Sequence, residues 1–95
     1  MQKIKPFRSQ KYKDWVKQLP SCISGLPADD PHHIKGRGYG GSVKPSDLFT
    51  MPLTREEHDD FHRIGWESWE AKHNVDQRDL VIATIERAIR EGVIK

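Results

Sequence analysis

The chain is 95 residues long, which allows one small domain with a single thin core. Its 35% hydrophobic and 32% charged residues exclude a plainly disordered chain, and its one cysteine, Cys22, excludes an internal disulfide and an all-cysteine metal site. The net charge is only +2, and no segment has the apolar length of a signal peptide or a membrane span, so we expect a cytoplasmic location and no membrane partner.

The first predicted element is a short amphipathic helix in the segment SQKYKDWVKQL, residues 9–19. Ser9 is a candidate N-cap, and Pro20 is expected to end the helix. The apolar residues at helical spacing are expected to face the core, and they are Tyr12, Trp15, Val16 and Leu19. In the turn-rich segment that follows, Cys22 is expected to be a small buried residue rather than a reactive thiol.

A hairpin with a wide glycine-rich connection is predicted next. The first expected strand is HHIK, residues 32–35, and the second is LFTMPL, residues 48–53. Pro52 is expected either to confine the second strand to an edge or to end its pairing.

A capping box is predicted directly after this hairpin. In the sequence TREE, Thr54 can accept a backbone hydrogen bond of the first turn while Glu57 reaches back, so a helix should start near Arg55. The helical stretch is expected to break at Gly65. Its predicted buried residues are Phe61, Ile64, Trp66 and Trp69.

The last predicted helix runs from about Gln77, with Asp76 as its cap, to Gly92. Its apolar side holds Leu80, Val81, Ala83, Ile85, Ala88 and Ile89. This stripe can pack on its own domain or against a second copy, so both a monomer and a homodimer fit the sequence.

Four of the five histidines fall into two groups, His32 with His33 and His58 with His62. Residues four apart share one helical face, so His58 and His62 can bind the same ion, although alone they can equally be solvated residues. Adjacent strand residues face opposite sides, so His32 can join them around one divalent cation while His33 stays free to act as a base. This combination suits phosphodiester hydrolysis, in which an imidazole takes a proton from water and a cation neutralises charge on the phosphate.

Other motifs are excluded. The sequence HDDFH lacks the glutamate of the zinc-protease motif, and the lone cysteine excludes a zinc finger or a zinc deaminase. The segment GRGYGG matches neither the dinucleotide-binding nor the P-loop fingerprint.

Two stretches, DPHH at residues 30–33 and TREEHDDFH at residues 54–62, resemble the HNH nuclease motif with its ββα-metal fold. The stretches CISGLPADDPHHIKGRGYGGSVKPSDLFTMPLTREEH and GWESWEAKH are also similar to phage HNH proteins of the recombination-enhancement, RecA-dependent nuclease (Ref-like) group. The resemblance implies a metal-dependent DNA endonuclease or nickase that is phage-encoded, acts in the cytoplasm of a bacterial host and is linked to recombination. It implies DNA and a RecA-type recombinase filament as partners.

The fold implied by the resemblance is α+β. A single HNH nuclease-like domain over residues 1–95 would consist of a basic N-terminal segment and helix in 1–19, a ββα-metal core in 20–73 and a C-terminal helix in 76–92.

The resemblance also implies a role for each matched residue. His33 corresponds to the general base, and the metal-binding positions are His32, His58 and His62. Asp30 is a supporting acid that orients the histidines or helps to hold the ion. The implied cofactor is one divalent metal ion, namely Mg²⁺, Mn²⁺, Ni²⁺ or Zn²⁺.

The sequence departs from the family pattern in two places. Many relatives hold a structural zinc with paired cysteines, and this zinc is not expected here because Cys22 is the only cysteine. The middle asparagine of HNH is also missing, since Asn74 is the only asparagine and lies outside the motif. Asp47 or Ser46 is expected to supply the polar contact that fixes the loop around the base, with Asp47 as the catalytic-site candidate.

Phosphate contacts are expected from the basic first part of the chain. Residues 1–44 carry nine Lys or Arg and three acids, whereas the remainder carries seven and eleven. The candidate DNA-binding residues are Lys35, Arg37, Lys44, Arg8 and Lys11, with Lys3, Lys5 and Lys13 extending the same footprint. Residue by residue, ordinary solvated charges account for the pattern equally well.

Two other functions fit the same residues. The chain can be a non-catalytic DNA-binding or recombination-accessory module that keeps the HNH fold, which the missing asparagine favours. It can also be a structural protein whose histidines bind zinc only for folding. Neither alternative explains why His33 should lie beside a metal ligand, and the nuclease is therefore preferred.

Overall fold

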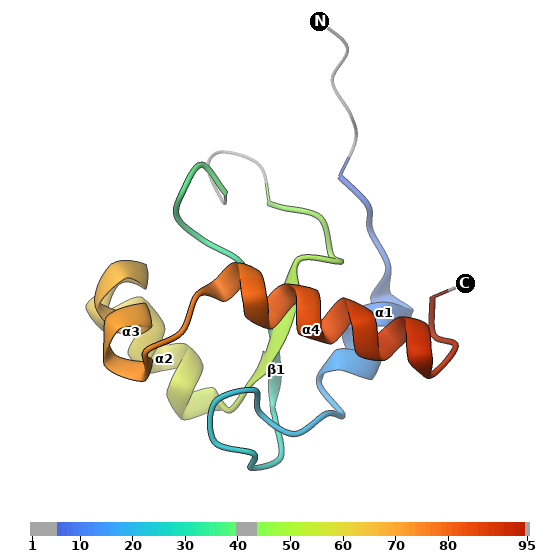
Figure 1. The fold of residues 1–95 in the computed structure, drawn as a ribbon, viewed down its shortest axis with the longest axis horizontal. Coiled ribbons are helices and arrows are strands. Elements are labelled where there is room, and N and C mark those ends of the chain that lie inside the picture. Colours follow the sequence, from blue (N-terminus) through green and yellow to red (C-terminus); the bar gives the residue numbers. More distant parts are fainter. Residues whose placement is uncertain (1–5, 40–43, 95) are drawn as a thin grey trace, which may run out of the picture.

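The computed structural model describes residues 6–39 and 44–94 as a small α+β protein (Figure 1). Its elements in chain order are α1 (Gln10–Val16), β1 (Asp30–His33), β2 (Thr50–Leu53), α2 (Arg55–Ile64), α3 (Trp66–His73) and α4 (Gln77–Arg90). The α+β class expected from the sequence is confirmed. The expected basic residues Lys3 and Lys5 and part of the glycine-rich connection lie outside the described residues.

The two strands form an antiparallel hairpin at the centre of the molecule. His32 lies opposite Met51 and His33 opposite Thr50. In Figure 1, α4 crosses in front of this hairpin, α1 lies on one side of it, and α2 and α3 lie on the other. The protein is therefore a two-stranded sheet enclosed by helices.

The second strand is shorter than expected, and β1 has the expected length of four residues but lies two positions earlier in the chain. It ends at His33 rather than Lys35, because Gly36 turns the chain with a φ of 89° and pairs with Tyr39. The second strand begins at Thr50 rather than Leu48, since the N–H of Phe49 bonds within a turn to Ser46. Pro52 does not end the pairing: in a two-stranded sheet both strands are edges, and the Pro52 carbonyl accepts a hydrogen bond from the N–H of Cys22 at 3.0 Å.

The first helix begins where the sequence indicates and ends early. The Ser9 side chain accepts a hydrogen bond from the N–H of Tyr12, which confirms the N-cap. The helix stops at Val16 instead of reaching Pro20, and Pro20 forms an isolated bridge with Pro27. Leu19 is nevertheless buried, as expected.

The capping box that starts α2 is confirmed, with both the Thr54 and the Glu57 side chains bonded to backbone N–H groups. Ser21 donates a further hydrogen bond to Glu57, which ties the turn segment to the start of α2. Gly65 separates α2 from α3 with a φ of 87°, so the expected break is also confirmed. Asp76 caps α4 through the N–H of Arg78, and the helix ends at Arg90, two residues before the expected Gly92.

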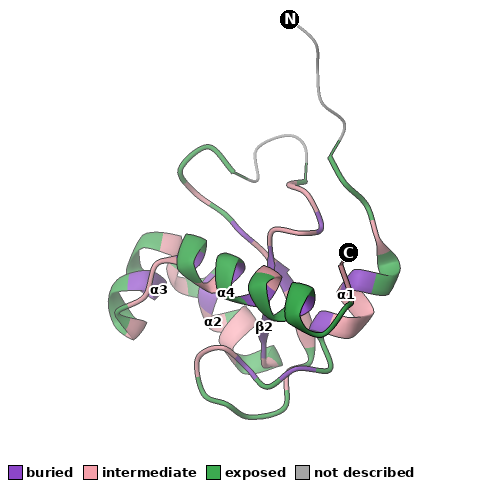
Figure 2. Ribbon diagram, turned by 45° about the vertical axis from the view of Figure 1, so that its right-hand side comes forward, coloured by how far each residue is buried: buried purple, intermediate pink, exposed green. Residues whose placement is uncertain are grey.

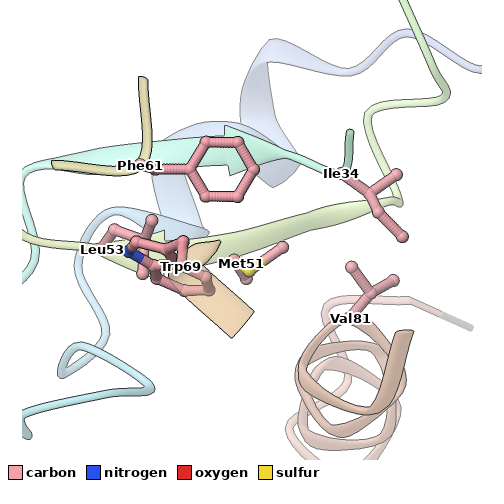
Figure 3. Packing of buried hydrophobic residues seen from close by; sticks show 6 residues of the cluster. All are labelled: Ile34, Met51, Leu53, Phe61, Trp69 and Val81. Carbon is pink, nitrogen blue, oxygen red and sulfur yellow. The ribbon is translucent and has the colours of Figure 1, made fainter. Parts of the chain in front are cut away.

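The main core lies between the hairpin, α2, α3 and α4. Its buried residues are Ile34, Met51, Leu53, Phe61, Trp69 and Val81 (Figure 3). A smaller cluster of Tyr12, Val16 and Ala88 joins α1 to α4. The main cluster thus packs α2 against the hairpin through Phe61, Met51 and Leu53.

Some residues expected in the core are not buried. Trp66 and Ile64 only pack against the edge of the main cluster, because Gly65 turns the chain between them. Ala83 and Ile89 are exposed, as is Ile82. Figure 2 shows that α4 has exposed residues along much of its length. Only part of the apolar surface of α4 is therefore buried against the other described residues. No helix among residues 6–39 and 44–94 is long and apolar enough to cross a membrane.

Candidate metal centre

Three histidines expected to bind a metal converge between β1 and α2. His32 projects from β1, and His58 and His62 project from one face of α2. One ring nitrogen from each lies within 4.8 Å of the others. The register of β1 turns His32 toward the core, where its ring contacts Phe61 at a centroid distance of 4.3 Å. The i, i+4 spacing on α2 then brings the other two imidazoles to the same point.

The donor set fits a bound divalent ion. His32 is 2% exposed and its Nε2 is a buried polar atom without a hydrogen-bond partner. Nε2 of His58 lies 2.9 Å from Nε2 of His62, so the second and third nitrogens already point at one another. A metal ion would give all three lone pairs a partner, and three imidazoles suit a transition metal such as Zn²⁺ or Ni²⁺ better than Mg²⁺.

Asp30 orients His58 from behind. Its Oδ2 lies 3.1 Å from Nδ1 of His58, which leaves Nε2 on the side of the other two histidines. The carboxylate is itself held by Arg55, whose Nε lies 2.9 Å from Oδ2. Metal-binding imidazoles usually donate their second N–H to a carboxylate in this way. This is the orienting role that the resemblance implies for Asp30, whereas no motif in the sequence indicates a role for Arg55.

The electrostatic environment keeps two of these imidazoles uncharged. Burial, together with the smaller effects of the neighbouring His58 and His62, lowers the pKa of His32 to about 3. The pKa of His62 is also lowered, by burial and then by the charge of His58. Neutral imidazoles are the form that binds metal, so these side chains need not lose a proton near neutral pH.

His33 faces away from this cluster and contacts Asp47. Nε2 of His33 lies 2.9 Å from Oδ1 of Asp47, and the two side chains are only 14% and 3% exposed. Burial would raise the pKa of Asp47, but hydrogen bonds from His33 and from the N–H of Ser9 outweigh it and leave the pKa below its usual value. A carboxylate only accepts hydrogen bonds, so Nε2 of His33 carries the proton and Nδ1 of the neutral ring keeps a lone pair.

The pKa of His33 is lowered, because burial has a larger effect than the opposing hydrogen bond to Asp47. The ring is consequently neutral near pH 7 and able to accept a proton. Of the two residues expected to replace the missing asparagine, Asp47 makes this contact, whereas the Ser46 hydroxyl accepts from the N–H of Leu48.

All four histidines line one open pocket of about 510 Å³. Three lysines from separate segments complete it: Lys13 of α1, Lys35 after β1 and Lys44 before β2. None of these lysines forms an ion pair with a described residue. The pocket thus combines a ligand set for a cation, a neutral imidazole and unpaired positive charge.

Comparison with known proteins places the chain in a family. Residues 1–92 match the family model described as "Protein of unknown function (DUF968)". The chain belongs to the DUF968 family. It is also 42% identical over 86 residues to the "Uncharacterized protein YdfU" of Escherichia coli strain K12. That match covers 90% of this chain and 24% of YdfU, so the chain spans about a quarter of the length of that relative. No solved structure matches the chain.

Within this DUF968 chain, two expected DNA-binding arginines are engaged elsewhere. Arg37 forms a forked ion pair with Glu70 at 2.8 and 2.6 Å, and its guanidinium lies 4.5 Å from the ring of Trp66. It belongs to a different and larger pocket of about 740 Å³, which is lined by acidic residues of α3 and α4. Arg8 bonds to Asp47. Lys11 is exposed on α1 and does not line the pocket that holds the histidines.

Gln77 holds Lys35, a residue of the pocket wall, although no sequence motif predicts a role for it. Its fully buried side chain bonds to both backbone groups of Lys35 and to Glu70. These bonds fasten the chain just after β1 to the start of α4. No local sequence signal predicts a contact across 42 positions.

Proposed function

We propose that this protein is a metal-dependent nuclease of the HNH (ββα-metal) type that hydrolyses DNA phosphodiester bonds. The observation that carries the proposal is the single pocket in which three metal-binding imidazoles adjoin a fourth, carboxylate-bound histidine. Two antiparallel strands followed directly by the histidine-bearing helix give the ββα order of the motif. The resemblance described above, rather than the DUF968 match, supplies the name of the activity.

The metal-binding residues in this proposal are His32, His58 and His62. A divalent ion bound there supplies Lewis acidity, which neutralises charge on the phosphate and on the leaving oxygen. Asp30 holds the ring of His58 in its metal-binding orientation. Of the four ions expected, the all-nitrogen ligand set favours Ni²⁺ and Zn²⁺ over Mn²⁺ and Mg²⁺, which prefer oxygen ligands.

His33 is the proposed general base. Its Nδ1 lone pair accepts a proton from water, and the Asp47 carboxylate stabilises the imidazolium that results. In this proposal the Asp47 carboxylate orients the imidazole of His33 and so takes the role of the missing asparagine. The proton leaves the attacking water and is held on Nδ1 of His33.

The three lysines of the pocket are the proposed phosphate-binding residues. Lys13, Lys35 and Lys44 give the pocket a positive charge, which an ion held by the three histidines would increase, and a nucleic-acid backbone has charge of the opposite sign. A phage origin, a bacterial cytoplasm and dependence on a RecA-type filament are parts of the proposal that rest on the resemblance alone.

Relaxation of supercoiled plasmid tests the activity. The purified protein is incubated with Mg²⁺, Mn²⁺, Ni²⁺ or Zn²⁺, beside an EDTA control and His33→Ala. We expect metal-dependent nicking that EDTA abolishes and that His33→Ala reduces by a factor of about 10²–10⁴, the usual contribution of a general base. Cutting that survives EDTA or the loss of His33 would contradict the proposal.

A DNA-binding accessory module is the second candidate. It is favoured by the unpaired lysines of the pocket, which can bind phosphate without any chemistry. In that case DNA affinity would fall steeply with salt, would be unchanged in His33→Ala, and no metal would produce nicks. A DNA-binding assay run on the same two proteins separates the two functions.

A further inference from the structure

The segment just before α1 is fastened to the segment just before β2. The carbonyl of Phe7 accepts a hydrogen bond from the N–H of Asp47 at 2.9 Å. The guanidinium of Arg8 donates to the carbonyls of Lys44 and Pro45, at 2.9 and 2.5 Å. Both of those residues line the pocket that holds the histidines. A stretch of backbone outside the ββα order therefore fixes one wall of the site.

The same segment fixes the carboxylate that contacts the proposed base. Oδ2 of Asp47 accepts the N–H of Ser9 at 2.8 Å, and Oδ1 lies 3.3 Å from Nη1 of Arg8. Oδ1 also lies 2.9 Å from Nε2 of His33. Because Asp47 is 3% exposed and both oxygens are engaged, its orientation depends on these neighbours rather than on water.

Ser9 contributes twice to this arrangement. Its hydroxyl caps α1 through the N–H of Tyr12, while its own N–H bonds to Asp47. The helix cap thus sets the direction of the amide that holds the carboxylate. The Asp47 side chain therefore connects the start of α1 to the ring of His33.

We propose that Phe7–Ser9 is a positioning segment of the site, in which Arg8 and the Ser9 amide orient Asp47 and thereby hold His33 in its Nε2–H tautomer. Arg8 is then a positioning residue that acts through Asp47, not a phosphate contact. The catalytic consequence rests on the nuclease function proposed above, but the effect on the His33 tautomer does not.

Nitrogen NMR of the ring measures the tautomer directly. The full chain, labelled with ¹⁵N and loaded with diamagnetic Zn²⁺, is compared with Arg8→Ala, Arg8→Lys and Asp47→Asn by long-range ¹H–¹⁵N correlation. Lys17→Ala is the matched control, because it removes one positive charge from an exposed residue directly after α1, whose ion-pair partner among the described residues is Asp14. We expect a protonated Nε2 and an unprotonated Nδ1 in wild type and in Lys17→Ala. We expect averaged ring signals in Arg8→Ala and Asp47→Asn.

Kinetics separate positioning from phosphate binding. If Arg8 acts through Asp47, Arg8→Ala lowers kcat of plasmid nicking by about 10- to 100-fold, the usual effect of an orienting partner, and changes KM little. Arg8→Lys keeps the charge but not the forked donors, so it should rescue only part of kcat. If Arg8→Ala fails to fold, as its amide spectrum would show, Arg8→Lys carries the test instead.

The possible results point in distinct directions. His33 signals that stay at their wild-type values in the folded Arg8 variants would overturn the positioning role, as would a raised KM with unchanged kcat. A changed tautomer in a protein that cuts no DNA under any condition supports the positioning role and rejects the nuclease. Normal nicking by both Arg8 variants keeps the nuclease and rejects the positioning role.

Discussion

The side-chain amide of Gln77 forms two hydrogen bonds with the backbone of Lys35, as a neighbouring strand would. The Nε2 of Gln77 donates to the Lys35 carbonyl at 2.8 Å, and the Lys35 N–H donates to Oε1 of Gln77 at 3.1 Å. The Gln77 side chain is fully buried, and its Nε2 also reaches Glu70. Both backbone groups of the residue that follows Ile34 are thus satisfied by a helix instead of a third strand. This contact anchors the chain directly after β1, the strand that carries His32 and His33, to the start of α4.

Replacing Gln77 with leucine should therefore destabilise the fold. We expect the free energy of unfolding to fall by about 1–3 kcal/mol, the cost of a buried polar group left unpaired, because the variant removes the buried bond to Glu70 and the part-buried bonds to Lys35. Urea denaturation of the two proteins measures the difference. Glu86→Gln, on the exposed face of the same helix, should change stability by no more than about 0.5 kcal/mol. An equal fall in the free energy of unfolding of both variants would show that the hydrogen bonds between Gln77 and Lys35 do not stabilise the fold.

Gly36 should not tolerate a side chain. Its φ is 89°, and a Cβ at this position would lie 2.3 Å from the ring of Trp66. Gly38 has nearly the same φ, 86°, with nothing within 4 Å of its Cβ position, so Gly38→Ala measures the backbone cost alone. We expect Gly38→Ala to cost about 1–2 kcal/mol and Gly36→Ala distinctly more, as seen in their melting temperatures. A similar cost for the two variants would mean that the ring of Trp66 moves aside freely.

The parts of the fold that depend on neighbouring residues could be predicted from the sequence. The Ser9 cap, the Thr54–Glu57 capping box and the break at Gly65 each need only a few adjacent residues, and all are confirmed. The convergence of His58 and His62 also follows from helical spacing, since Nε2 of one lies 2.9 Å from Nε2 of the other.

The parts that depend on distant residues could not be predicted. Arg37 was expected to face phosphate because it is a cation in a glycine-rich loop. Its actual partner, Glu70, lies 33 positions away, and charge patterning does not identify it. The early end of β1 also depends on a distant residue, because both backbone groups of Lys35 bond to Gln77 rather than to β2.

The ion pair between Arg37 and Glu70 should make stability depend on pH. The Arg37 guanidinium beside Glu70 holds the pKa of that carboxyl below its usual 4.5, with hydrogen bonds from Gln77 adding to the effect. A lowered pKa in the folded state contributes stability above the unfolded pKa, and this contribution is lost as the pH falls through the folded value. Glu70→Gln should therefore be less stable than wild type at pH 7, and the difference should shrink as the pH falls below about 4.5.

Urea unfolding of wild type and Glu70→Gln at a series of pH values from 7 to 3 measures this difference. Glu86→Gln again serves as the control, since Glu86 is exposed on α4 and lies 4.0 Å from Arg90. A stability difference between wild type and Glu70→Gln that stays constant over the whole range would rule out the pKa of Glu70 as its source.

Metal binding by the three histidines should raise the melting temperature. An ion that binds only the folded state stabilises it by about 2.7 kcal/mol at a concentration one hundred times its Kd. We expect Zn²⁺ and Ni²⁺ to increase the melting temperature clearly and Mg²⁺ to change it little, because all three ligand atoms are imidazole nitrogens. His32→Ala should remove most of this increment, since its buried Nε2 then no longer contributes a lone pair. His73→Ala is the matched control, because His73 lies at the end of α3 and is not one of the three clustered histidines. An increment that persists in His32→Ala, or that is lost equally in His73→Ala, would place the ion elsewhere on the protein.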